Sequence, residues 1–274
     1  MLTDRVRRHC ARVAHAARHV TIDLDADVRA GGVSGLDEQL HFLEGAPEDV
    51  TRYVLILDAV NFGSGWFEEL GVTTDALTER LTAHARAEGP WSPPQLRALD
   101  AAEVGATLAL PVEHELTRLY TSALQQLGAF LPVRLGDSAD AFAQALTAMP
   151  FFDDRGFYKR AQIAANDLVL AGVADFADVD RLTIFADNLV PHVLRMDGVL
   201  RYDEELAALV DARVPLPAGG VHERELRACA VHACEGLAAR LGVPPRRLDN
   251  WLWNRGERPP YNERPAHVTR TVYY

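Results

Sequence analysis

The stretch YKRAQIAANDLVLA, residues 158–171, holds Lys159, the only lysine in a chain with 28 basic side chains. Its apolar residues recur with the period of an α-helix, so we predict a helix here. Arginine is a permanently charged planar fork, whereas the lysine ammonium is compact and its pKa shifts readily on burial. A lysine kept in such an arginine-rich chain indicates a tight phosphate contact, an ion pair in a narrow pocket or an amine nucleophile. The alternative is a leftover surface residue.

One side of this predicted helix carries an unusual polar stripe. Lys159, Gln162 and Asn166 follow one another at helical spacing and therefore share one face. A solvated face in this chain is normally built from Arg and Glu, whereas this one has an ammonium and two amides. Amides both donate and accept hydrogen bonds, which suits the reading of a base or sugar edge. The alternative is a plain surface stripe.

The helical pattern extends over most of the chain, and Pro and Gly mark the joints between helices. Further helices are predicted over residues 4–19, 48–62, 74–88, 113–130, 139–149, 203–212, 222–241 and 245–254. Two short alternating segments, 20–24 and 267–274, are predicted to be strands. We therefore predict a mainly α fold, a single helical domain over residues 1–274 with at most a small β-ribbon.

Composition and charge exclude several classes of protein. A net charge of −11 argues against a nucleic-acid partner, because such binding needs a basic surface, although a pocket for one phosphate remains possible. No apolar run reaches the roughly 18 residues of a membrane helix, and the first residues lack the apolar core of a signal peptide. Three cysteines are too few for a disulfide framework. We expect a cytoplasmic monomer with no membrane partner.

The segment from Asp180 to Gly198 places a carboxylate beside irregular backbone. Either one helix, capped by Asp180, runs through Pro191 and kinks there, or a new helix begins near Pro191. In both cases Asp187 lies next to the break, inside an otherwise apolar run. A buried carboxylate must be paired or functional, and Lys159 is its obvious partner. The alternative is that Asp187 is only a helix cap.

The segment LILDAVNFGSGWF, residues 55–67, is a candidate ligand slot. Asp58 and Asn61 lie one turn apart near a predicted helix end, and a Gly-Ser-Gly turn then leads to Trp66. An amide facing aromatic rings across a flexible turn can hold a planar ligand; the alternative is a helix end with core aromatics. A lone His232-x-x-Glu235 pair is a weak metal signal, so we predict no metal.

Five motifs in order resemble the queuosine salvage protein family: His41-Phe42, LDAVNF at 57–62, FYKRAQ at 157–162, LTIFADNLVP at 182–191 and HVTRTVYY at 267–274. The resemblance runs from about His41 to the end of the chain. It implies hydrolysis of queuosine 5′-phosphate to queuine and ribose phosphate, with no cofactor. It also implies a helical fold similar to that of helix-hairpin-helix DNA glycosylases, in which an Asp sits at a helix start.

Two departures from the family pattern concern the site. Gly63-Ser64-Gly65 stand where the family often has bulkier residues, and Asn188-Leu189 stand where it often has Tyr-Arg. The slot near Trp66 and the surroundings of Asp187 are therefore expected to differ in detail.

The residues and the resemblance together give a predicted site. Asp187 stabilises an oxocarbenium-like sugar, and either orients water or attacks C1′. Lys159 keeps Asp187 ionised or contacts the phosphate. The predicted substrate-binding residues are Asn61, Asp58, Trp66, Phe185, Asn188, Tyr158, Gln162, His41 and Arg270. Trp66 and Phe185 are expected to sandwich the base, and Arg270 to clamp the phosphate. Two rivals remain: a non-catalytic binder of modified nucleosides, and a DNA-glycosylase-like enzyme, which the acidic charge disfavours.

Overall fold

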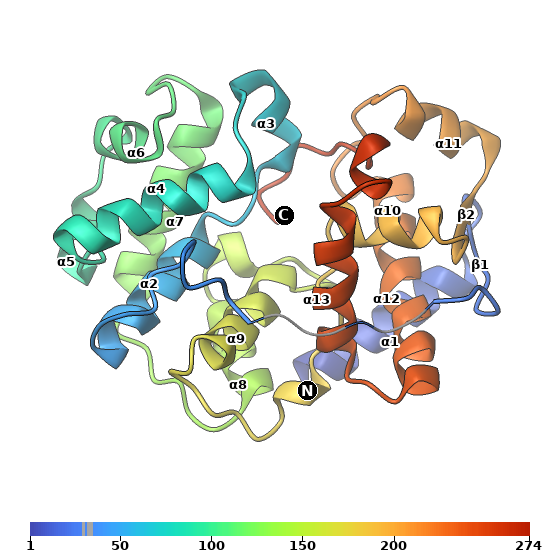
Figure 1. The fold of residues 1–274 in the computed structure, drawn as a ribbon, viewed down its shortest axis with the longest axis horizontal. Coiled ribbons are helices and arrows are strands. Elements are labelled where there is room, and N and C mark those ends of the chain that lie inside the picture. The colour runs from blue at the N-terminus through green and yellow to red at the C-terminus, as the bar shows by residue number, and fades with distance from the viewer. Residues whose placement is uncertain (29–30, 32–34) are drawn as a thin grey trace.

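The predicted helical pattern is confirmed by a computed structural model, which describes residues 1–28, 31 and 35–274 (Figure 1). The α-helices among these residues are α1 (Leu2–His15), α2 (Pro47–Ala59), α3 (Ser64–Leu70), α4 (Thr74–Glu88), α5 (Pro93–Ala98), α6 (Ala101–Leu108), α7 (Glu115–Phe130), α8 (Ala139–Leu146), α9 (Lys159–Leu170), α10 (Leu189–Met196), α11 (Glu204–Asp211), α12 (Val221–Leu241) and α13 (Pro245–Gly256). Short 3-10 turns are η1 (Pro150–Phe152), η2 (Val179–Arg181) and η3 (Tyr261–Glu263). None of these helices is long and apolar enough to cross a membrane.

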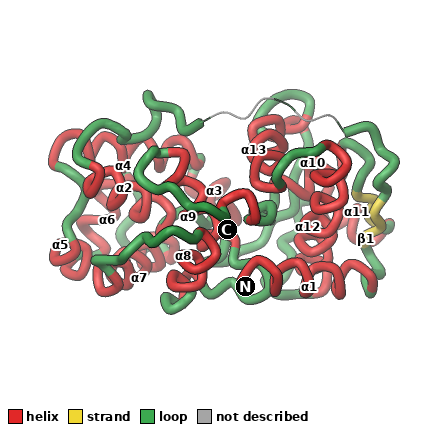
Figure 2. Tube along the Cα trace, turned by 90° about the horizontal axis from the view of Figure 1, so that it is seen from below, coloured by secondary structure: helices red, strands yellow, loops and turns green. Residues whose placement is uncertain are grey.

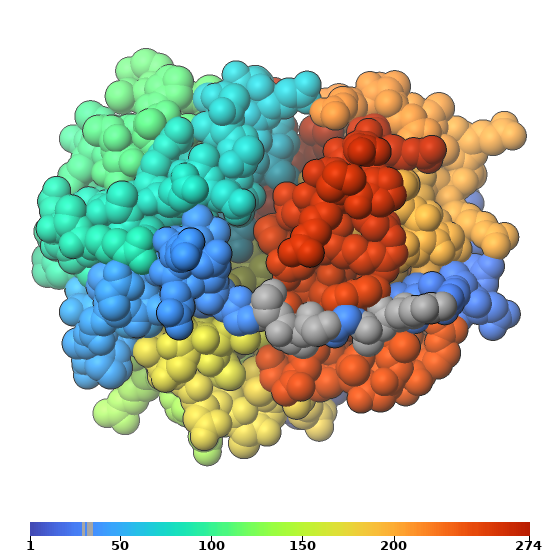
Figure 3. Space-filling model, in the orientation of Figure 1, coloured from blue at the N-terminus to red at the C-terminus, as the bar shows by residue number. Residues whose placement is uncertain are grey.

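The helices form two halves with α8 and α9 between them (Figures 1 and 2). Helices α2 to α7 make one half, in which α7 packs against α2, α5 and α6. Helices α10 to α13 make the other with α1, which lies along α12. Helix α9 packs against α2 from the first half and against α8. The surface is hollowed where the cyan α3–α4 region meets the red α13 region (Figure 3).

The chain after η2 settles the two alternatives for Pro191. Helix α10 begins at Leu189, so Pro191 lies in its first turn, where the missing N–H has no partner to lose. Asp187 and Asn188 therefore stand just before a new helix. The predicted cap at Asp180 is wrong, because this residue lies within η2 and pairs with Arg246 instead.

The predicted β-ribbon exists, but only one of its predicted strands is correct. Strand β1 (Val20–Ile22) pairs antiparallel with β2 (Leu200–Tyr202), in the register Val20 to Tyr202. The predicted strand at 267–274 is wrong. That segment is extended but forms no ladder with another strand. Its carbonyl oxygens accept isolated hydrogen bonds instead: Tyr274 accepts from the Gly63 N–H, and Val272 accepts from Arg160.

Helices α10 and α13 approach closely at one glycine. A methyl group built on Gly256 would lie 2.7 Å from Leu189 Cγ and 2.9 Å from Val193 Cγ2. Both distances are shorter than real carbon contacts, so the absence of a side chain at Gly256 sets the separation of the two helices.

Candidate active site

Lys159 is the first residue of α9, and the backbone before it is strained. Tyr158 has φ of 50° and ψ of 41°, a left-handed conformation that bulky residues rarely adopt. The Lys159 N–H points to Asp154 Oδ2 at 3.3 Å, and the lysine side chain is 6% exposed. Lys159 therefore enters the interior, and the alternative of a leftover surface lysine is wrong.

Asp187 uses its two carboxylate oxygens for different purposes. Oδ1 accepts the backbone N–H groups of Leu189 at 2.8 Å and Val190 at 3.1 Å, the free donors of the first turn of α10. Oδ2 faces Lys159 Nζ at 4.0 Å, and the Asp187 side chain is 9% exposed. The predicted partnership of Asp187 with Lys159 is thus present in the structure, with Asp187 acting as a helix cap at the same time.

A buried ion-pair layer lies against both residues. Arg227 on α12 binds Asp154 Oδ2 at 2.5 Å and Glu223 Oε1 at 3.1 Å, and its Nε donates to the Ala186 carbonyl at 2.9 Å. Asp154 accepts the Lys159 N–H, and Ala186 directly precedes Asp187. One guanidinium therefore fixes the backbone on both sides of the ion pair.

More carboxylates surround Lys159 than it can neutralise. Burial, then the charge of Asp167, raises the pKa of Asp58 well above its usual range, against opposing effects of Lys159 and the Asn61 amide. Burial also raises the pKa of Asp167 to about 6, although the Asn166 amide and Lys159 oppose the rise. Burial lowers the pKa of Lys159 itself, and Asp187 opposes that shift most strongly. The local balance is acidic, which favours the protonated forms of Asp58 and Asp167 relative to free carboxyls.

Asp249 on α13 is another carboxyl of this group. Its Oδ1 accepts the Phe185 N–H at 2.7 Å, two residues before Asp187. Burial, then the charge of Asp187, raises the pKa of Asp249 to about 8. Sequence analysis missed Asp249, because it lies in a regular amphipathic helix with no motif around it.

The polar stripe of α9 is buried rather than solvated, so the surface-stripe alternative is wrong: Gln162 is 0% and Asn166 5% exposed. Gln162 is held by protein, accepting the Thr183 N–H at 3.0 Å and donating to the Phe157 carbonyl at 2.9 Å. Asn166 accepts from Arg246 at 3.2 Å. Gln162 thereby ties α9 to the segment that leads into Asp187, and its predicted contact with substrate stays a prediction.

Trp66 on α3 is buried, 4% exposed, and the exposed Arg270 lies beside it. Trp66 Nε1 donates to Glu115 at 3.2 Å, and the Arg270 guanidinium lies 5.9 Å from the Trp66 ring while pairing with Glu69 at 2.5 Å. Among the described residues, no hydrogen bond or ion pair joins either side chain to Lys159 or Asp187. The predicted base and phosphate contacts of Trp66 and Arg270 stay predictions.

The remaining predicted residues lie either beside Lys159 and Asp187 in the chain or close to one end of α2. Tyr158, Phe185 and Asn188 flank Lys159 or Asp187 in the chain, and Phe185 is 5% exposed. His41 lies in the segment before α2, with Nδ1 at 3.0 Å from the Asp37 carbonyl oxygen. Asn61 follows the end of α2, where its N–H donates to the Asp58 carbonyl at 3.4 Å.

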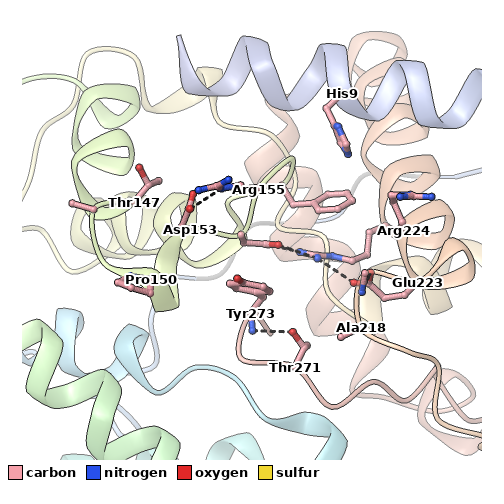
Figure 4. A pocket seen from close by; sticks show the side chains of 15 residues that line it. His9, Thr147, Pro150, Asp153, Arg155, Ala218, Glu223, Arg224, Thr271 and Tyr273 are labelled. Carbon is pink, nitrogen blue, oxygen red and sulfur yellow. Dashed lines mark hydrogen bonds and ion pairs between the residues drawn. The ribbon is translucent and has the colours of Figure 1, made fainter.

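A cavity of about 770 Å³ is lined in part by the ion-pair residues Asp154, Glu223 and Arg227 (Figure 4). Its rim carries Arg155, which pairs with Asp153 at 2.8 Å, and Glu223, which pairs with Arg227. Lys159 and Asp187 do not line it. Most of its charges are already matched by neighbours, so it offers little net charge to a phosphate. Among the described residues, no group of three or more His, Cys, Asp or Glu could hold a metal ion.

Comparison with known proteins adds an independent result. The family model described as "Queuosine salvage protein" matches residues 137–274. A relative from Sphaerobacter thermophilus, named queuosine 5′-phosphate N-glycosylase/hydrolase, is 32% identical, and the alignment covers 96% of this chain and 95% of the relative. Proteins of the same name from Dictyostelium discoideum and Mus musculus are 36% and 34% identical over 43% of this chain and 40% of their own length. The five motifs, the helical fold and these matches agree: the chain belongs to the queuosine salvage protein family.

Proposed function

We propose that this protein hydrolyses the N-glycosidic bond of queuosine 5′-monophosphate, releasing the 7-deazaguanine base queuine and ribose 5-phosphate. Salvage of queuine for tRNA modification is the process that this reaction serves. The observation that carries the proposal is the buried pair of Lys159 Nζ and Asp187 Oδ2, 4.0 Å apart, with Lys159 at the start of α9 and Asp187 just before α10. The relative aligned over 96% of this chain and the relative aligned over 43% of it carry the same name, which supports queuosine 5′-phosphate as the substrate.

The chemistry follows from the split roles of the Asp187 oxygens. Departure of the base leaves an oxocarbenium-like sugar, and an ionised carboxylate stabilises that cation. Oδ1 is held by α10, so the carboxylate is fixed in place, and Oδ2 is left to face the sugar. From there Oδ2 either orients a water molecule or attacks C1′ itself. The 4.0 Å spacing supports Lys159 as the group that keeps Asp187 ionised.

Base recognition is proposed for Asp58 and Asn61. Asp58 is fully buried, and the Asn61 amide is close enough to lower its pKa, but neither carboxylate oxygen has a well-formed hydrogen bond among the described residues. A buried carboxyl so weakly satisfied is unfavourable unless a ligand completes it. The 7-deazaguanine edge presents adjacent N–H donors that match two carboxylate oxygens. Because Asp58 is covered, base binding must displace what covers it.

The other substrate contacts are proposed from the motifs. Phe185 and Trp66 are assigned to the base faces, Arg270 to the phosphate, and His41, Tyr158, Asn188 and Gln162 to the rest of the nucleotide. Single alanine substitutions that leave KM and kcat unchanged would remove a residue from this set. A cytoplasmic monomer is also proposed, supported by three cysteines that are buried free thiols.

Product analysis tests the proposed function. Incubation with queuosine 5′-monophosphate should give free queuine and ribose 5-phosphate, separated by chromatography. A non-catalytic binder of modified nucleosides would return the intact nucleotide. The free nucleoside should react far more slowly, about a hundredfold by kcat/KM, because remote binding energy is used at the reacting centre. Equal efficiency on both would refute a phosphate pocket, and a gel shift with duplex DNA would favour a DNA-glycosylase-like activity.

A further inference from the structure

Asp249 and Asp187 are held by the same loop, and Lys159, which pairs with Asp187, also acts electrostatically on Asp249. Asp249 comes from α13 and Asp187 from the start of α10, and each has one oxygen fixed by backbone N–H groups of the same loop: Phe185 for Asp249, and Leu189 and Val190 for Asp187. The side chains of Asp249, Asp187 and Lys159 are all nearly excluded from water. Two carboxylates against a single ammonium in such a place cannot both ionise without an uncompensated buried charge.

Among the described residues, Lys159 is the cation that acts most strongly on Asp249. From α9 it is faced by Lys159 and Asp167, and from the segment before α10 by Asp187. From α12 it is faced by the Cys234 thiol, whose pKa is raised by burial and then by Asp249 itself. The nearby Arg246 on its own helix is paired with Asp180 beside η2. Lys159 lies against Asp187 at 4.0 Å, so the proton falls to Asp249.

We propose that Asp249 is a positioning residue that must carry a proton for the enzyme to work. As a neutral acid it accepts the Phe185 N–H without competing with Asp187 for Lys159. Once Asp249 ionises, the two carboxylates divide the attraction of the ammonium, and Asp187 loses its fixed partner. The pair therefore sets the alkaline limit of hydrolysis. This inference rests on the proposed function.

The raised pKa of Asp249, about 8, gives the direction of the pH effect. The protonated form is active, so kcat/KM should be level near neutral pH and fall by about tenfold per pH unit above the ionisation. Asp249→Asn imitates the neutral acid and keeps an oxygen for the Phe185 N–H. We expect this variant to lose about threefold or less at neutral pH and to keep that rate where the wild type declines.

Asp197→Asn is the matched control. Asp197 is also a buried carboxyl, 7% exposed, but it pairs with Arg255 and with the Tyr261 hydroxyl, away from Lys159. This variant should keep the wild-type decline at alkaline pH. A decline that persists in Asp249→Asn would assign it to loss of the Lys159 proton and overturn the proposal. A folded but inactive Asp249→Asn would also overturn it, because the proton would then be a reactant.

A second measurement needs no activity. In the substrate-free protein labelled at the aspartate carboxyl carbons, one carboxyl signal should titrate near pH 8 by NMR in the wild type and be missing from Asp249→Asn, since the pKa of Asp249 is about 8. If the signal that Asp249→Asn removes does not titrate above neutral pH, the proposal fails whatever the substrate is. If it does titrate but queuosine 5′-monophosphate is not cleaved, the proposed function fails and the protonated Asp249 stands.

Discussion

The Arg227 cluster and the Lys159 cluster are neighbours with opposite designs. Arg227, 3% exposed, meets two carboxylates at 2.5 and 3.1 Å, and its third nitrogen is bonded to a carbonyl. Lys159 meets Asp187 at 4.0 Å, and burial raises the pKa of the nearby carboxyls of Asp58 and Asp249. The first cluster is fully satisfied and holds the backbone. The second is loosely paired, which leaves a charge available to a ligand. A chain that uses Arg at almost every basic position thus keeps its Lys in the cluster whose charge is available to a ligand.

The largest expected effect is that of Asp187→Asn. The amide keeps an oxygen for the Leu189 N–H, so α10 should still begin correctly, but the negative charge that faces the sugar is lost. We expect kcat to fall by about a thousandfold with an unchanged melting temperature. Asp180→Asn, at a carboxylate that is 54% exposed, is the control and should keep full activity. Near-normal turnover by Asp187→Asn would remove it from the mechanism.

Arg227→Met tests the satisfied cluster. It leaves Asp154 and Glu223 buried without their cation, so the free energy of unfolding should fall by about 3–5 kcal/mol. Thermal or denaturant unfolding measures this. Arg155→Met removes a guanidinium that is 84% exposed and should leave the unfolding midpoint unchanged. An unchanged midpoint for Arg227→Met would mean that the cluster does not hold the fold.

Lys159→Arg keeps the charge and changes only the shape. The compact ammonium lies buried 4.0 Å from Asp187, and a guanidinium fork in the same place should displace Asp187. Displacement of about 1 Å can lower the rate about a hundredfold. Steady-state kinetics with the folded variant gives the answer, and a fully active Lys159→Arg would show that the lone lysine is incidental.

The smallest expected effect is on how thermal stability depends on pH. The folded-state pKa of Asp58 is raised above its unfolded value, so the wild type loses stability as pH rises from that unfolded value toward the folded one. Asp58→Asn carries no such loss. Its melting temperature relative to wild type should therefore increase between about pH 4 and pH 7, by roughly 2–4 °C for each kcal/mol. A constant difference across that range would mean that Asp58 is ionised in the folded protein.

The sequence could predict the features that depend on local pattern. Helical periodicity predicted the fold class, the lone Lys159 marked the candidate site, and Pro191 marked the break beside Asp187. The predicted strand at 267–274 failed because alternation reports an extended chain with alternate residues buried, and the tail has that property without a strand partner. Asp249 and Asp58 could not be placed, because their approach to Lys159 depends on how α13 and α2 pack against α9 rather than on any neighbouring residue.

The bare Gly256 gives this arrangement a point of adjustment that lies outside the chemistry. It lets α13, which carries Asp249, rest against the first turns of α10, which begins just after Asp187. A single methyl group there would act as a spacer and would move the two carboxyls apart without altering either one. The distance between α10 and α13 can thus tune the proton affinity of the two carboxyls, and with it the working pH range of the protein.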